Sequence, residues 1–139
     1  MNLTDHFTLE EMIHSASADA RHLDNEPNAV QTENLKNLCE NVLEPLRKVI
    51  GKPIQINSGY RSETVNRYAG GVKNSQHLFG RAADITVAGM KPEQLLDLLL
   101  NSHIVFDQAI AYRHRGFMHV SYFKGWNRMI FHVDHKKNS

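Results

Sequence analysis

The chain has 139 residues, of which 41% are hydrophobic, so it is long enough to bury a core, and we expect a single domain over residues 1–139. Its net charge of +1, counted with neutral histidines, gives no electrostatic reason to expect nucleic acid or a membrane as a partner. No apolar run approaches the ~18–20 residues that a membrane-spanning helix needs. Cys39 is the only cysteine, which excludes an internal disulfide and a thiolate metal cluster. We expect a monomer.

The first residues, MNLTDHFTLEEMIH, carry acidic side chains where a secretory signal would have a basic start and an apolar centre. We therefore expect the protein to be made in the cytoplasm without a signal peptide. Thr8 and Glu11 fit a capping box, which predicts a short helix over about residues 9–15. The polar stretch 15–28 has no clear period and is expected to be a loop.

The strongest helical pattern follows this loop. Its helix ends at Gly51, and Pro45 inside it removes one backbone donor, so we expect a kink there. Cys39 lies in the same helix and is expected to be buried rather than reactive. The apolar stripe recurs at three- and four-residue steps, at Leu35, Leu38, Val42, Leu46 and Val49.

The rest of the chain mixes short strands and helices. The pattern predicts a strand at 54–56, a short helix at 62–68, a loop at 72–79, a strand from Asp84 and a helix from Pro92. Strand-like runs at 105–112, 117–123 and 129–133 are expected to form an antiparallel meander. The predicted fold class is therefore α+β, with helices packed on a small, mainly antiparallel sheet.

His77 and Asp84 are the first candidate metal ligands. His77 lies on a glycine-containing loop, and Asp84 enters the apolar run Asp84-Ile85-Thr86-Val87. An ionised aspartate is rarely buried without a partner, so Asp84 needs an arginine, a helix N-terminus or a metal ion. Arg81, three residues earlier, is the alternative partner to a metal.

His119 lies between apolar neighbours in Met118-His119-Val120. Alone, such a histidine is more often a hydrogen-bonded core residue than a ligand. Together with His77 and Asp84, however, it would complete a set of two histidines and one aspartate with a fourth position open to water, as catalytic zinc requires. A donor set without thiolate suits zinc better than copper. The spacing alone does not decide between a metal site and an ion pair of Asp84 with Arg81. Arg61 is a separate candidate, either a surface cation or a residue that binds a substrate carboxylate with two hydrogen bonds.

Three stretches in this order, SGYRSETVN, SQHLFGRAADI and MHVSY, resemble the zinc-dependent D-Ala-D-Ala carboxypeptidase family. That family also includes phage L-alanyl-D-glutamate endolysins and shares its fold with the hedgehog signalling domain. The resemblance runs from about residue 54 to 122. It implies a hedgehog-like fold and Zn²⁺ held by His77, Asp84 and His119. It also implies substrate binding by Arg61, with Ser75 and Gln76 shaping the metal loop.

The chain departs from this family at the general base, which family members supply as a carboxylate before the last zinc histidine. The two positions where it is expected hold Gly116 and Tyr112. His114 is the candidate substitute base, and Tyr112 a candidate electrophilic donor. His114 could curl over the metal or, between Arg113 and Arg115, point into solvent.

The resemblance implies a zinc peptidase that cleaves peptidoglycan stem peptides, as a carboxypeptidase or an endopeptidase. A cell-wall enzyme made without a signal would suit a phage or prophage lysis protein that is released by a separate pore. The alternative is a catalytically impaired, zinc-containing binding or structural module of a phage particle, and the missing carboxylate favours it.

Overall fold

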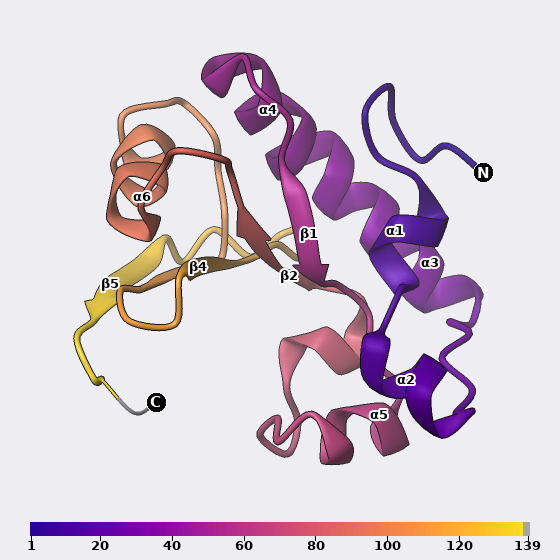
Figure 1. Ribbon diagram of the computed structural model, residues 1–139. Helices are drawn as coiled ribbons and strands as arrows, with labels where there is room; N and C mark the ends of the chain where they lie inside the picture. Colours follow the sequence, from indigo (N-terminus) through magenta and orange to yellow (C-terminus); the bar gives the residue numbers. More distant parts are fainter. Residues whose placement is uncertain (138–139) are drawn as a thin grey trace.

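The computed structural model describes residues 1–137, and a five-stranded mixed sheet forms its centre (Figure 1). The strands lie in the order β1-β2-β4-β3-β5. β1 pairs antiparallel with β2, β2 with β4 and β4 with β3, whereas β5 runs parallel to β3. The strands are β1 (Gln55–Ser58), β2 (Ala82–Thr86), β3 (Gln108–Tyr112), β4 (Phe117–Ser121) and β5 (Ile130–Asp134).

The helices come mostly before the sheet in the chain, which confirms the predicted α+β class. Thr8 closes the predicted capping box with Glu11 at the start of the first helix. No helix of residues 1–137 is long and apolar enough to cross a membrane. The helices are α1 (Leu9–Ile13), α2 (Ala16–Arg21), α3 (Ala29–Leu38), the π-helix η1 (Cys39–Leu43), α4 (Glu44–Ile50), α5 (Glu63–Tyr68), the 3₁₀ helix η2 (Gln76–Phe79) and α6 (Pro92–Leu100).

Two local predictions differ from the structure. The stretch 15–28 was expected to be a loop, but it contains α2, because the Ser15 hydroxyl accepts a hydrogen bond from the Ala18 amide and caps a single short helix. The stretch 72–79 includes η2. At Pro45 the perturbation of the helix takes the form of η1, in which the Glu44 amide donates to the Cys39 carbonyl just before the proline that cannot donate.

The expected antiparallel meander is wrong for its last strand. β5 does not pair with β4 but lies parallel to β3, at the edge of the sheet. The connection after β4 crosses back, so that the Met129 and Ile130 amides donate to the carbonyls of Phe106 and Asp107 at the start of β3. Arg128 also binds the buried Asp107 carboxylate at 2.6 Å. These contacts start β5 at the same end as β3, so the two strands must run in the same direction.

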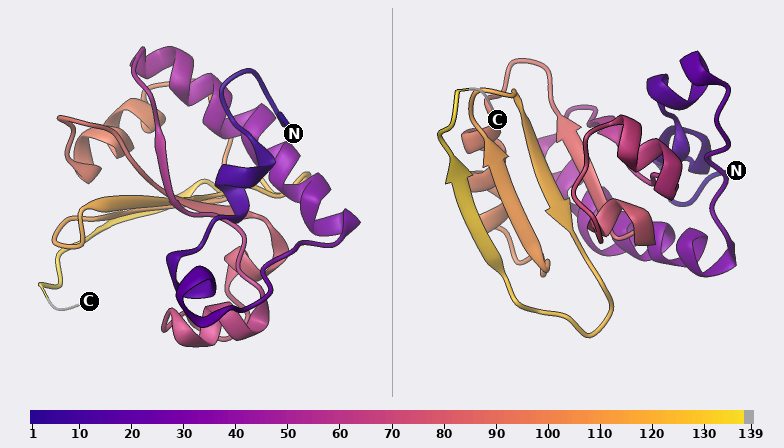
Figure 2. Two further views of the ribbon diagram at one scale, coloured as in Figure 1. Left: turned by 45° about the vertical axis from the view of Figure 1, so that its right-hand side comes forward. Right: turned by 90° about the horizontal axis from the view of Figure 1, so that it is seen from below.

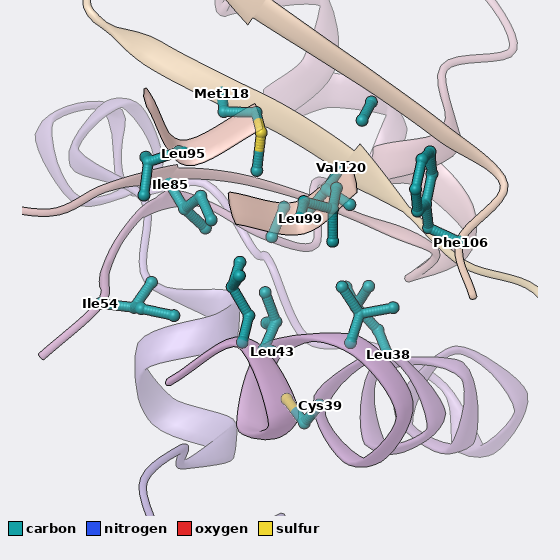
Figure 3. Packing of buried hydrophobic residues seen from close by; sticks show 14 of the residues in the cluster. Leu38, Cys39, Leu43, Ile54, Ile85, Leu95, Leu99, Phe106, Met118 and Val120 are labelled. Carbon is teal, nitrogen blue, oxygen red and sulfur yellow. The ribbon is translucent and has the colours of Figure 1, made fainter. Parts of the chain in front are cut away.

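The two faces of the sheet have different tasks. Helices α3, α4 and α6 cover one face, and α5 with η2 lies on the other side of the sheet (Figure 2). Ile85, Met118 and Val120 point into the core, where they meet Leu38 and Leu43 of the long helical segment and Leu95 and Leu99 of α6 (Figure 3). Because side chains alternate along a strand, Asp84 and His119 face away from this core. The core therefore fixes the strands whose opposite face carries the polar residues.

Candidate metal centre and cleft

His77, Asp84 and His119 come together on the polar face of the sheet. Asp84 of β2 lies directly opposite His119 of β4 in the strand register, so both side chains point the same way. η2 brings His77 over them. Asp84 Oδ1 lies 2.9 Å from Nδ1 of His119 and 3.2 Å from Nε2 of His77, and one donor atom from each residue falls within 4.8 Å of the others.

η2 is fixed by residues at both of its ends and by contacts with α3. Ser75 caps it by accepting a hydrogen bond from the His77 amide, and Gly80 ends it with a φ of 72°. A Cβ at Gly80 would lie 2.4 Å from the carbonyl oxygen of Gln31, so α3 requires glycine here. Gln31 and Asn34 of α3 donate side-chain hydrogen bonds to two carbonyls of the same turn. The loop that carries His77 is therefore fixed against α3.

The His77 ring is oriented by the segment that follows β1. Its Nδ1 lies 2.7 Å from the Gly59 carbonyl oxygen, which accepts a hydrogen bond from the ring and so directs Nε2 towards Asp84. In return, the Arg61 amide donates to the His77 carbonyl at 3.1 Å. A carbonyl that accepts a hydrogen bond from the second ring nitrogen, as Gly59 does here, fixes the tautomer and direction of a metal-binding histidine.

Asp84 divides its two oxygens between different partners. Oδ1 faces the two histidines, and Oδ2 lies 3.4 Å from Nη2 of Arg61. Burial by itself raises the pKa of Asp84, but the hydrogen bonds and positive charge of His119 and His77 outweigh it and hold the pKa below its usual range. No salt bridge within residues 1–137 joins Asp84 to Arg81, whose guanidinium lies 3.7 Å from the ring centroid of Phe123 instead.

The three donors fit zinc by chemistry and by spacing. Zn–N and Zn–O bonds of ~2.0–2.2 Å in a tetrahedron place neighbouring donor atoms about 3.3 Å apart. The distance from Asp84 Oδ1 to His77 Nε2, 3.2 Å, is close to this value, and the distance to His119 Nδ1, 2.9 Å, is a few tenths of an ångström shorter. Three protein ligands without thiolate also match the sets of catalytic zinc sites, which keep a fourth position for water or substrate.

The candidate centre opens into a cleft of about 420 Å³. Arg61, Ser75, Gln76 and Tyr112 all line it, as does the metal set, so the structure brings together every predicted site residue except His114. Arg61 is a mostly buried side chain of this wall. Besides Asp84, it donates to the Ser58 hydroxyl at 2.9 Å and to the Asn66 side-chain oxygen at 3.2 Å. Two of its five N–H groups remain for a ligand.

Gln76 links the cleft to a buried charge. Its side-chain nitrogen donates to Asp107 at 3.0 Å, and its side-chain oxygen is buried without a hydrogen-bond partner in the described part of the chain. The side chain of Asp107 is fully buried and also accepts two hydrogen bonds from Arg128. Asp107 thus fixes the residue that precedes His77.

The two candidate catalytic residues are placed differently. Tyr112 lines the cleft, and its pKa is raised by burial and by the charge of Asp84, so its hydroxyl stays protonated at neutral pH. His114 is exposed in the β3–β4 turn and does not line the cleft. Asp84 is the only carboxylate among the described residues of the lining.

Sequence reasoning missed three contributors to the site. The Gly59 carbonyl orients His77, Asn66 anchors Arg61, and Arg115 lines the cleft. A carbonyl has no signature in a sequence. The position of Arg115 in a turn two residues before the Phe117 strand was visible, but only the direction of its side chain shows that it reaches the cleft.

Comparison with known proteins places these residues in a family. A family model described as Peptidase M15 matches residues 5–121. A curated relative, the zinc D-Ala-D-Ala carboxypeptidase of Streptomyces albus G, is 48% identical over 44 residues, a match that covers 31% of this chain and 17% of the relative. This chain thus spans only a small part of that protein. With most of its length matched and the three-donor cluster at its centre, the chain belongs to the M15 peptidase family.

Proposed function

We propose that the protein is a zinc-dependent peptidase that acts on the stem peptides of peptidoglycan. The observation that carries this proposal is the His77–Asp84–His119 cluster at the base of a cleft whose wall holds Arg61. The relative's name, a zinc D-Ala-D-Ala carboxypeptidase, supports the substrate class. Both carboxypeptidase action and L-Ala-D-Glu endopeptidase action remain part of the proposal.

The roles of the chain's own residues follow from their contacts. His77, Asp84 and His119 would hold Zn²⁺, which when bound supplies a Lewis acid for the scissile carbonyl and lowers the pKa of water to ~7. Arg61 keeps Asp84 in place through Oδ2 and offers its remaining N–H groups to a peptide carboxylate. Tyr112 keeps its proton and can donate it in a hydrogen bond to an oxygen of the substrate.

A second function is favoured by one specific observation. Within the described lining, no carboxylate is left to accept a proton once Asp84 serves as a ligand. This favours a catalytically impaired zinc module that binds cell-wall peptides, for example in a phage particle. The phage or prophage lysis setting, with synthesis in the cytoplasm and action at the cell wall after release, belongs to the proposal and rests on the resemblance to phage endopeptidases.

The test combines metal analysis with a peptidoglycan digest. Protein purified without chelator should contain about one zinc per chain, and purified sacculi should release shortened stem peptides that mass spectrometry identifies. Tyr112→Glu places a carboxylate on the cleft wall, with Tyr112→Gln as the matched control. A general base contributes ~10²–10⁴-fold, so an impaired wild type should gain turnover of this order only in Tyr112→Glu.

The outcomes separate the two functions. Turnover by the wild type that is lost with zinc supports the peptidase. A zinc-containing but inactive wild type, together with an active Tyr112→Glu variant, supports the binding module. Protein that contains no zinc and cleaves nothing in any variant would refute both.

A further inference from the structure

Arg115 is a cation in the cleft that none of the roles above uses. It lies in the turn between β3 and β4, and its guanidinium carbon sits 5.2 Å from the ring centroid of Tyr112 and 4.9 Å from that of Phe117. Both rings belong to the cleft lining, as does Arg115 itself. These cation–π contacts stabilise the guanidinium at the cleft wall.

Along the strand order of the sheet, Arg61 and Arg115 lie on either side of the metal ligands. Arg61 follows β1, the metal ligands Asp84 and His119 are on β2 and β4, and Arg115 follows β3, in the sheet order β1-β2-β4-β3. Arg61 and Arg115 both line the cleft that contains the metal ligands. A substrate that fills this cleft can therefore contact both guanidinium groups.

The charge of Arg115 is not neutralised by the protein. No salt bridge joins it to a carboxylate in residues 1–137, whereas its neighbour Arg113 pairs with Glu93 at 3.5 Å. The charged side chains of the lining are two arginines and one aspartate, so the cleft is positive even before a divalent cation is added. Such a cleft attracts anionic ligands.

We propose that Arg115 is a specificity-determining residue that binds a second carboxylate of the substrate, so that the cleft selects peptides with two carboxylates over peptides with one. The proposal rests on the peptide-binding function above. Arg61 holds one carboxylate near the metal, and Arg115 holds another on the β3–β4 side. In stem peptides, the free carboxylate of the D-glutamyl residue is of this kind, and its amidated form lacks the charge.

The experiment compares two synthetic pentapeptides, L-Ala-γ-D-Glu-L-Lys-D-Ala-D-Ala and the same peptide with the D-glutamyl carboxylate amidated. Isothermal titration calorimetry measures the Kd of each peptide with the zinc-loaded protein. Where the peptides are cleaved, the preference is read as the ratio of their KM values at unchanged kcat. Because Arg115 is exposed, we expect roughly a fivefold preference for the free acid, decreasing with added salt. Arg115→Gln should abolish the preference, and Arg113→Gln, in the same turn but paired elsewhere, should keep it.

Failure of this proposal differs from failure of the proposed function. An Arg115-dependent preference in binding supports the proposal even if neither peptide is cleaved. An equal affinity of the wild type for both peptides, a preference that survives in Arg115→Gln, or no binding of either peptide would overturn it. Cleavage of both peptides at equal KM would overturn it while leaving the peptidase intact.

Discussion

Gly59 is the position where one added methyl group should disturb both the fold and the metal centre. An ideal Cβ at Gly59 would lie 2.2 Å from the carbonyl oxygen of Met12, about 1 Å inside the normal carbon–oxygen contact of roughly 3.3 Å. The obstacle is backbone, so α1 or the segment after β1 must move. That movement also strains the hydrogen bond from the Tyr60 amide to the Met12 carbonyl, 2.8 Å long.

The size of the effect follows from these contacts. Overpacking costs ~1–3 kcal/mol and a lost backbone hydrogen bond ~1 kcal/mol, so Gly59→Ala should lower the free energy of unfolding by about 2–4 kcal/mol. With an unfolding entropy of ~2.1 cal/mol/K per residue, this corresponds to a Tm lower by about 7–14 °C. Because the Gly59 carbonyl orients His77, zinc affinity should also fall by ~10–100-fold.

The assay is thermal unfolding by circular dichroism together with a competition titration of zinc against a chromophoric chelator. Gly51→Ala is the control, since Gly51 has a φ of 73° and open space around its Cβ position. It should lose about 1 kcal/mol of stability through backbone strain while keeping its zinc affinity. If Gly59→Ala binds zinc as tightly as Gly51→Ala does, the Gly59 carbonyl does not orient His77 and the reasoning fails.

Three further predictions concern single side chains. His119→Ala should lose zinc and stability, whereas His132→Ala, on the exposed edge strand, should lose neither; equal zinc content in both would show that the third ligand is misassigned. Burial raises the pKa of Cys39 to about 12, so the native thiol should resist iodoacetamide at pH 9 and react only after unfolding. The free energy of unfolding should also fall as pH rises above ~9, because the thiol ionises more easily in the unfolded chain. Rapid alkylation of the native protein would contradict the burial of Cys39. Hydrogen bonds from Arg128, against burial, lower the pKa of Asp107, so this carboxylate stabilises the fold above pH ~4 and less as pH falls below it. Asp107→Asn should lower Tm at pH 7 and weaken its dependence on acid pH, and an unchanged acid profile would refute the assignment.

The sequence predicted those parts of the fold that depend on local pattern. The apolar stripe is confirmed from Leu35 to Leu46, because amphipathic periodicity determines which face is buried, but its last member, Val49, is exposed near the end of the helix. The Pro92 start of α6 is also confirmed. Cys39 is fully buried, as its helical setting predicted. The direction of β5 was not predictable, because it depends on the long-range pair of Asp107 and Arg128.

The candidate site divides in the same way. The types and spacing of His77, Asp84 and His119 suggested a metal set before any geometry was available. Which arginine binds Asp84 was a three-dimensional question: Arg61 reaches it from a distant part of the chain, while Arg81, three residues away, stacks on aromatic rings. Proximity in sequence favoured Arg81, whereas the folded chain brings Arg61 to Asp84.

Because Asp84 pairs opposite His119, metal binding depends on the register in which β2 and β4 pair. These residues are 35 positions apart, and a slip of one residue between β2 and β4 would turn one of the two side chains into the core. Only the native register places both side chains next to His77. Zinc binding therefore stabilises the native register and no neighbouring one. Since the site is complete only after this distant pairing, we expect zinc to slow unfolding much more than it accelerates folding, a difference that stopped-flow kinetics with and without zinc can measure.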